Sequence, residues 1–214
     1  SRAKKLIDRL PSEYVHYCLG DLLEAGVTER LVEQTVAHFG RLDILINNAA
    51  LSPRNNIDSI TTEEFDWIFD LDVKAPLFLT KAAVAHFRQR KYKGAIVNIG
   101  SINAYTGETA MVAYSMAKGA LMTMTRNLGD ALSEEGIRVN QLNVGWTLTE
   151  NEAMLKQKQG FPEDWERYIP KTFAPSGRLV RPEEVAAHVV FWASEQSMPA
   201  SGQVYEVEQY PIIG

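Results

Sequence analysis

The stretch Gly94-Ala-Ile-Val-Asn-Ile-Gly-Ser101 decides the fold class. Its apolar run, residues 95–99, is too short for a helix, contains β-branched side chains and is bounded by glycine, which predicts a buried strand. Four further runs of this kind predict strands elsewhere in the chain, at residues 14–19, 42–46, 138–144 and 204–207.

Helical patterns separate these strands. Apolar residues at steps of three and four share one face of a helix over residues 27–39. Thr61-Thr-Glu-Glu is a capping-box signal for a second helix that continues through residues 81–90. A third helix is expected at residues 113–133. Arg181-Pro-Glu-Glu opens a fourth, with proline in its first turn.

Strict alternation of strands and helices predicts an α/β domain with a mainly parallel sheet between two layers of helices, a three-layer α/β/α arrangement. The length of 214 residues suits one domain, residues 1–214. Residues 147–177 interrupt the alternation with a strand-free segment that contains several aromatic residues, Phe161, Trp165, Tyr168 and Phe173. We expect this insertion to form a wall of the substrate pocket; the alternative is a surface insertion without function.

Composition narrows the class of protein. Apolar residues make up 45% and charged residues 23% of the chain, as in ordinary globular proteins. The net charge of −5 argues against a nucleic-acid or anionic-membrane partner, and a single cysteine excludes a disulfide framework. The four histidines are scattered without metal-ligand spacing, so no metal site is predicted. A cytoplasmic protein is expected.

The sharpest chemical signal is Tyr114-Ser-Met-Ala-Lys118. Positions i and i+4 share a helix face, so the Lys118 ammonium is expected beneath the Tyr114 ring. A nearby cation lowers the pKa of a phenol toward the range useful for proton transfer. Ser101 ends its strand at the carboxyl edge of the sheet, where α/β folds place ligands, and its hydroxyl could hold a substrate oxygen. Alone, a Tyr-x-x-x-Lys pair is equally typical of a surface helix.

The order and spacing of four segments favour a catalytic role for this pair. The segments are Leu42-Asp-Ile-Leu-Ile-Asn-Asn-Ala-Ala50, Gly94 to Ser101, Tyr114 with Lys118, and Ile137-Arg-Val-Asn140. Together they resemble the classical short-chain dehydrogenase/reductase family across essentially the whole chain. The resemblance implies a doubly wound Rossmann-type sheet, NAD or NADP as cofactor, and hydride exchange with a carbonyl or alcohol substrate.

The resemblance also implies roles for individual residues. Tyr114 matches the catalytic acid/base, Lys118 its partner and ribose ligand, and Ser101 the hydroxyl that orients the carbonyl. Further positions match the family's cofactor-binding residues: Asp21 and Leu22 at the adenine, Asn47 and Ala49 along the dinucleotide, and Val144, Gly145 and Thr147 beside the nicotinamide.

The sequence departs from the family in two ways that matter. Asp72 stands where the family usually has an asparagine that completes a proton relay, and its charge beside Lys118 is expected to alter the titration of Tyr114. None of the fourteen glycines stands in the family's Gly-x-x-x-Gly-x-Gly turn. We therefore expect Ser1 to lie within the helix after a missing first β-α-β unit, in a protein about forty residues longer; a truncated, inactive paralogue is the alternative.

Two alternative functions differ in how well they fit the sequence. A non-catalytic binding or regulatory protein of the same fold is the main alternative, whereas a sugar-nucleotide epimerase or dehydratase lacks room for its second domain. Polar residues expected at the pocket mouth favour a hydroxylated substrate such as a sugar or polyol; these are Arg54, Asn103, Glu108 and Glu150.

The resemblance further implies a homodimer or homotetramer. Family members commonly pair the two helices expected here at residues 61–90 and 113–133 across a two-fold axis. The apolar residues expected to need cover on those helices are Phe78, Leu79, Ala82, Ala83, Phe87, Ala117, Ala120, Leu121, Met124 and Leu128.

Overall fold

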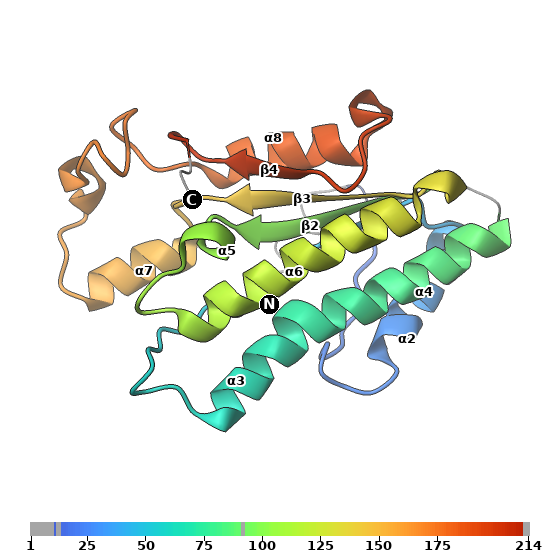
Figure 1. Ribbon diagram of the computed structural model, residues 1–214, viewed down its shortest axis with the longest axis horizontal. Helices are drawn as coiled ribbons and strands as arrows, with labels where there is room; N and C mark the ends of the chain where they lie inside the picture. The colour runs from blue at the N-terminus through green and yellow to red at the C-terminus, as the bar shows by residue number, and fades with distance from the viewer. Residues whose placement is uncertain (1–10, 12–13, 91–92, 212–214) are drawn as a thin grey trace.

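A parallel four-stranded sheet lies at the centre of the computed structural model, which describes residues 11, 14–90 and 93–211. The strands follow one another in the order β1-β2-β3-β4, and their bounds are Ile44–Asn47, Ala95–Ser101, Arg138–Val144 and Val204–Val207 (Figure 1). The predicted Rossmann-type α/β fold is confirmed. The expectation for Ser1 lies outside the described residues.

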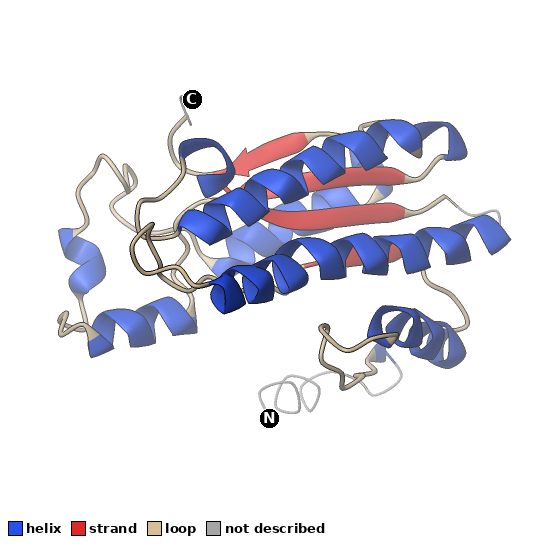
Figure 2. Ribbon diagram, turned by 60° about the horizontal axis from the view of Figure 1, so that its bottom comes forward, coloured by secondary structure: helices blue, strands red, loops and turns tan. Residues whose placement is uncertain are grey.

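Helices cover both faces of this sheet (Figure 2). The helices in the described part of the chain are α2 (Val27–Phe39), α3 (Thr62–Phe69), α4 (Ala75–Arg90), α5 (Asn103–Thr106), α6 (Val112–Ala131), α7 (Glu150–Lys158) and α8 (Pro182–Ala193). Short 3-10 turns occupy Ser133–Glu135, Trp165–Tyr168 and Glu195–Ser197. Helices α4 and α6 pack on one face and α8 packs on the other.

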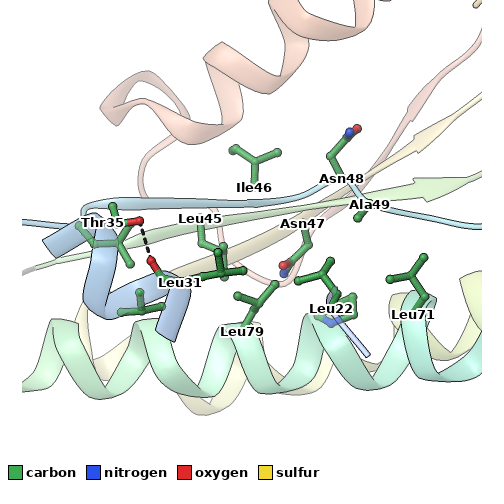
Figure 3. Close-up of a pocket in the computed structure, with 13 residues that line it drawn as sticks. Leu22, Leu31, Thr35, Leu45, Ile46, Asn47, Asn48, Ala49, Leu71 and Leu79 are labelled. Carbon is green, nitrogen blue, oxygen red and sulfur yellow. Dashed lines mark hydrogen bonds between the residues drawn. The ribbon is translucent and has the colours of Figure 1, made fainter. Parts of the chain in front are cut away.

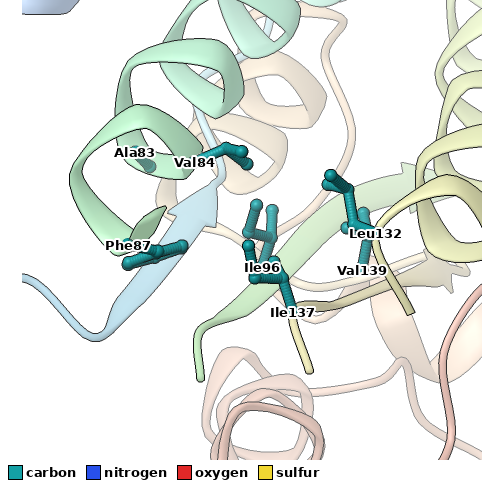
Figure 4. Close-up of a cluster of buried hydrophobic side chains, with 7 residues drawn as sticks. All are labelled: Ala83, Val84, Phe87, Ile96, Leu132, Ile137 and Val139. Atoms are coloured by element: carbon teal, nitrogen blue, oxygen red, sulfur yellow. The ribbon is translucent and has the colours of Figure 1, made fainter. Parts of the chain in front are cut away.

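The core explains why neighbouring positions of β2 are both apolar. Ile96 packs with Phe87 and Val139 in a cluster beneath α4 and α6 (Figure 4). Its neighbour Val97 points to the opposite face, where it packs with Leu142 and residues of α8. Both faces of a parallel sheet are buried, so both alternating positions of a strand must be apolar.

The helix predicted from the Thr61 signal consists of three pieces. The Thr61 hydroxyl accepts a hydrogen bond from the backbone N–H of Glu64 at 3.2 Å and caps α3. A π-helical segment, Asp70–Lys74, then joins α3 to α4. Single π-helical turns widen a helix locally and often occur at functional sites. This one carries Asp72.

The strand predicted at residues 14–19 is not formed. This segment is irregular, and Tyr14 and Leu19 are 72% and 78% exposed. A strand needs a neighbour that accepts its ladder hydrogen bonds, and among the described residues β1 pairs only with β2. The prediction from the apolar pattern was wrong because the pattern does not specify a pairing partner.

Residues 147–177 form no strand of the sheet, as expected, and project beyond the carboxyl ends of the strands with α7 (Figure 1). Of their four aromatic residues, only Trp165 is buried; Phe161, Tyr168 and Phe173 are 48%, 72% and 54% exposed. That the insertion forms a wall of the substrate pocket stays a prediction.

Several residues expected at a subunit contact belong to the core instead. Ala117 and Leu121 of α6, and Ala83 and Phe87 of α4, are at most 1% exposed. Leu128 packs against the cluster of Figure 4. The sheet covers these faces because both helices lie directly on it.

None of the helices in the described part of the chain has the length and apolarity needed to cross a membrane.

Candidate active site

Lys118 lies at the centre of the candidate site. It is one turn beyond Tyr114 on α6, and its ammonium lies 5.4 Å from the centroid of the tyrosine ring. The same Nζ donates a hydrogen bond to the Ile99 carbonyl of β2 at 3.1 Å. Only 3% of the Lys118 side chain is exposed, so its position is fixed by these contacts.

Asp72 provides the opposite charge. Its Oδ2 lies 3.4 Å from Lys118 Nζ, and its side chain is completely buried. Its Oδ1 accepts a hydrogen bond from the backbone N–H of Leu51 at 2.8 Å, which ties the loop after β1 to the π-helical segment. A buried ion pair of this kind is sensitive to the loss of either partner, because the remaining charge would be buried without compensation.

The electrostatics of Tyr114 differ from the expectation. Burial raises the pKa of its phenol to about 12; a hydrogen bond with Ser101 acts against this shift, and the Asp72 charge adds to it. Burial also lowers the pKa of Lys118 and raises that of Asp72, while each partner's charge opposes the other's shift. The prediction of a lowered tyrosine pKa is wrong for this arrangement, because desolvation outweighs the hydrogen bond with Ser101. Asp72 alters the titration of Tyr114, as predicted: its charge raises the pKa of the phenol.

Ser101 ends β2 beside these groups and is 7% exposed. Its Oγ accepts a hydrogen bond from the backbone N–H of Asn103 at 3.2 Å, and the next residue, Ile102, donates its N–H to the Val144 carbonyl of β3. The serine is thus held at the carboxyl edge of the sheet. The structure brings together the four predicted catalytic residues, Asp72, Ser101, Tyr114 and Lys118.

Three predicted cofactor residues line one cavity of about 270 Å³ between α2, β1 and α4 (Figure 3). They are Leu22, Asn47 and Ala49. Leu45 and Asn47 point toward α4 whereas Ile46 points to the other side, as alternation along a strand requires (Figure 3). Asp21 is exposed and accepts a hydrogen bond from the Leu23 N–H, so it does not line this cavity.

The other predicted cofactor residues lie at the end of β3. Gly145 donates its N–H to the Val207 carbonyl of β4, and Thr147 Oγ1 donates to the Gly145 carbonyl. Sequence reasoning missed Glu208, whose Oε2 accepts the backbone N–H of Trp146 at 3.1 Å. A Cβ at Gly145 would displace this carboxylate, which is the end of a flexible side chain.

Sequence reasoning also missed a chain of buried polar groups across the sheet. Asn47 Nδ2 donates to Asn98 Oδ1 at 2.8 Å, Asn98 Nδ2 donates to Thr125 Oγ1 at 2.8 Å, and Thr125 Oγ1 contacts Gln141 Oε1 at 2.9 Å. The signal for it was present, because Asn98 interrupts an otherwise apolar strand. Buried polar networks fix a unique arrangement when their members are satisfied.

The residues present fit one end of a nicotinamide dinucleotide. An ammonium has three donors, and Lys118 directs donors to Ile99 and Asp72, which leaves one for a ribose hydroxyl. Asn47 Oδ1 is buried and accepts no hydrogen bond within the described residues. The cavity beside it has mainly apolar walls, as an aromatic base requires.

Comparison with known proteins agrees with this geometry. A family model described as enoyl-(acyl carrier protein) reductase matches residues 1–209. An uncharacterized oxidoreductase of Bacillus subtilis is 34% identical over 221 aligned positions, which cover 97% of this chain and 70% of that protein. The chain belongs to the short-chain dehydrogenase/reductase family.

Two further relatives of this short-chain dehydrogenase/reductase have more specific descriptions. A 2-dehydro-3-deoxy-D-gluconate 5-dehydrogenase of Escherichia coli is 29% identical over 189 positions, covering 88% of this chain and 72% of that protein. A solved structure described as ElxO with NADP bound superimposes with a TM-score of 0.86 at 26% identity, covering 96% of this chain and 83% of that one.

Proposed function

We propose that this protein is an NAD(P)-dependent oxidoreductase that exchanges hydride with a carbonyl or alcohol group, with Tyr114 as the acid/base. The observation that carries the proposal is the convergence of Ser101, Tyr114 and Lys118 at the carboxyl edge of the sheet, next to buried Asp72. The relatives described as an oxidoreductase and a dehydrogenase support the reaction class.

When bound, the nicotinamide cofactor supplies or accepts the hydride. Ser101 Oγ orients the substrate oxygen, and the Tyr114 hydroxyl gives that oxygen its proton. A phenol whose pKa is raised to about 12 remains protonated at neutral pH, which suits a proton donor. We therefore infer that carbonyl reduction is favoured at neutral pH and that alcohol oxidation requires alkaline conditions.

The cofactor is assigned to the cavity and strand ends described above. We propose that Leu22, Asn47 and Ala49 contact the dinucleotide, and that Val144, Gly145 and Thr147 flank the nicotinamide. Lys118 would hold a ribose hydroxyl with its remaining donor. The description of the solved relative as bound to NADP supports this class of cofactor.

The substrate proposed is a hydroxylated carbonyl compound such as a keto sugar, a sugar acid or the oxidised form of a polyol. The polar atoms near Ser101 support this, in particular half-buried Asn103, as does the sugar-acid dehydrogenase among the relatives. Residues 147–177 are proposed to form one wall of the substrate site. We also propose a homodimer or homotetramer through α4 and α6.

The test is direct measurement of cofactor oxidation. Purified protein is incubated with NADH or NADPH and a panel of keto sugars, keto sugar acids and simple ketones, and the loss of reduced nicotinamide is followed together with the alcohol formed. We expect turnover with a hydroxylated ketone and one alcohol per cofactor consumed. Cofactor binding by calorimetry without turnover of any substrate would favour a non-catalytic binding protein instead.

A further inference from the structure

Lys156 of α7 lies among three aromatic rings. Its Nζ is 5.4 Å from the Trp146 ring centroid, 5.0 Å from that of Phe161 and 5.6 Å from that of Trp165. The lysine side chain is only 13% exposed. A cation within about 6 Å of aromatic faces is attracted to them, and more strongly where water is excluded.

A carboxylate completes this arrangement. Glu152 Oε1 accepts a hydrogen bond from Trp146 Nε1 at 3.1 Å and lies 3.9 Å from Lys156 Nζ. The Trp146 and Trp165 rings are 5.8 Å apart and tilted by 34°. We call these five residues, Trp146, Glu152, Lys156, Phe161 and Trp165, the lysine box.

The lysine box holds one face of α7. No residue of this helix is fully buried, so it has no apolar stripe docked on the core. Its half-buried residues are Glu152, Leu155 and Lys156, which share one face, and two of the three belong to the box. A helix attached through a charged pair and aromatic rings depends on that charge more than an ordinary core helix does.

Trp146 places one end of the lysine box at the candidate active site. Trp146 follows Gly145, and its own N–H is held by Glu208. Two residues earlier, the Val144 carbonyl accepts the N–H of Ile102, the neighbour of Ser101. The box therefore connects α7 and residues 161–165 to the strand end that carries the proposed nicotinamide contacts.

We propose that Lys156 is a positioning residue for the reaction: its ammonium holds α7 and residues 161–165 against Trp146 and thereby fixes the wall of the substrate site. This inference rests on the proposed function. The residue touches neither substrate nor cofactor in this role, so its loss affects substrate binding more than the chemical step.

The test compares three variants in a Trp67→Phe background, because exposed Trp67 would otherwise dominate the fluorescence. Trp192 of α8 also contributes, so each variant is compared with this parent protein. Lys156→Met keeps the stem and removes the charge, Lys156→Arg keeps the charge, and Lys158→Met is a matched control on the exposed side of α7. Acrylamide quenching of tryptophan fluorescence reports whether Trp146 and Trp165 remain covered. Steady-state kinetics then separates KM from kcat.

We expect Lys156→Met to increase quenching and to raise the substrate KM about tenfold with kcat within about twofold, the size of effect that losing a desolvated cation–π contact would give. Lys156→Arg should restore both values, and Lys158→Met should change neither. Unchanged quenching and KM in Lys156→Met would overturn the proposal, and so would increased quenching with an unchanged KM.

Two other outcomes are covered by the design: a Lys156→Met variant that does not fold, and a wild type without activity. If Lys156→Met does not fold, Phe161→Ala removes one half-exposed face of the box and makes the same prediction. If the wild type has no oxidoreductase activity, the proposed function fails, but the quenching experiment still decides whether the charge of Lys156 holds the segment in place.

Discussion

The carboxylate of Asp72 lies 3.4 Å from the Lys118 ammonium in a site almost closed to solvent. Its charge raises the pKa of Tyr114, on top of the larger effect of burial. An amide at position 72 would keep the side-chain volume and remove this contribution. The residue therefore raises the pH at which the tyrosine becomes a phenolate, in addition to the larger effect of burial.

We expect Asp72→Asn to move the pH profile of alcohol oxidation toward lower pH, because oxidation needs the phenolate and the variant lowers the Tyr114 pKa. Turnover should stay within about tenfold of the wild type if position 72 assists through its surroundings rather than by carrying the proton. Asp70→Asn is the matched control, since Asp70 lies on the same π-helical segment but pairs with exposed Lys74. A profile that does not move would contradict the assigned role of the Asp72 charge.

A charged cap stabilises the first turn of α8. Arg178 donates two hydrogen bonds to the Glu184 carboxylate, at 2.9 and 2.6 Å, and the backbone N–H of Arg181 donates a third at 2.8 Å. These bonds, that of Arg178 first, lower the pKa of Glu184 from 4.5 to about 2. The glutamate therefore stabilises the folded state while it is ionised.

The pH dependence of this contribution follows from its sign. The folded-state pKa lies below the ordinary value, so the stabilisation is complete above pH 4.5 and is lost as the pH falls toward about 2. We expect Glu184→Gln to lower the melting temperature at neutral pH, with a difference from the wild type that disappears in acid. Thermal unfolding followed by circular dichroism checks this, with adjacent Glu183→Gln as control. Equal losses at both pH values would contradict the assignment.

The elements that the sequence predicted well are those with local signals. Thr61 caps α3 and Pro182 begins α8, because a cap or a first-turn proline acts within one helical turn. The strand at residues 14–19 was predicted wrongly because ladder pairing depends on a partner far away in the sequence. The π-helical segment was not predicted either, since its extra residue leaves no local pattern.

In the candidate site, too, the sequence predicted the features with local signals and missed those that depend on distant residues. The spacing of Tyr114 and Lys118 and the strand end at Ser101, taken together with the family resemblance, predicted that these residues meet. The direction of the Tyr114 pKa shift was not predictable, because it depends on how deeply the phenol is buried. Glu208 was missed because its contact with Trp146 joins residues 62 positions apart.

For the whole molecule, the exposed parts of α4 and α6 are where we expect a second copy to bind. Leu77 and Phe78 of α4 are 40% and 39% exposed, and Met116 of α6 is 52% exposed. A two-fold contact places the same patch on both partners, so a charge introduced there acts twice. Leu128 is unsuitable as a probe of this contact, because it packs against the core.

We expect light scattering to give the wild type the mass of a dimer or tetramer, and Met116→Glu to lower that mass. Met154→Glu on α7 is the control, since this methionine is 42% exposed but lies on a different helix. A wild type of monomer mass would refute the assembly, and an unchanged mass for Met116→Glu would place the contact elsewhere.

The central claim is that Tyr114 transfers the proton in the reaction of the whole protein. Its most direct test is the turnover of Tyr114→Phe at saturating cofactor and substrate, with calorimetry to measure cofactor affinity and with Tyr205→Phe as a control on exposed β4. We expect turnover of Tyr114→Phe to fall by roughly 10²–10⁴, the usual value of general acid–base catalysis, with unchanged cofactor affinity. Near-wild-type turnover of Tyr114→Phe would contradict it.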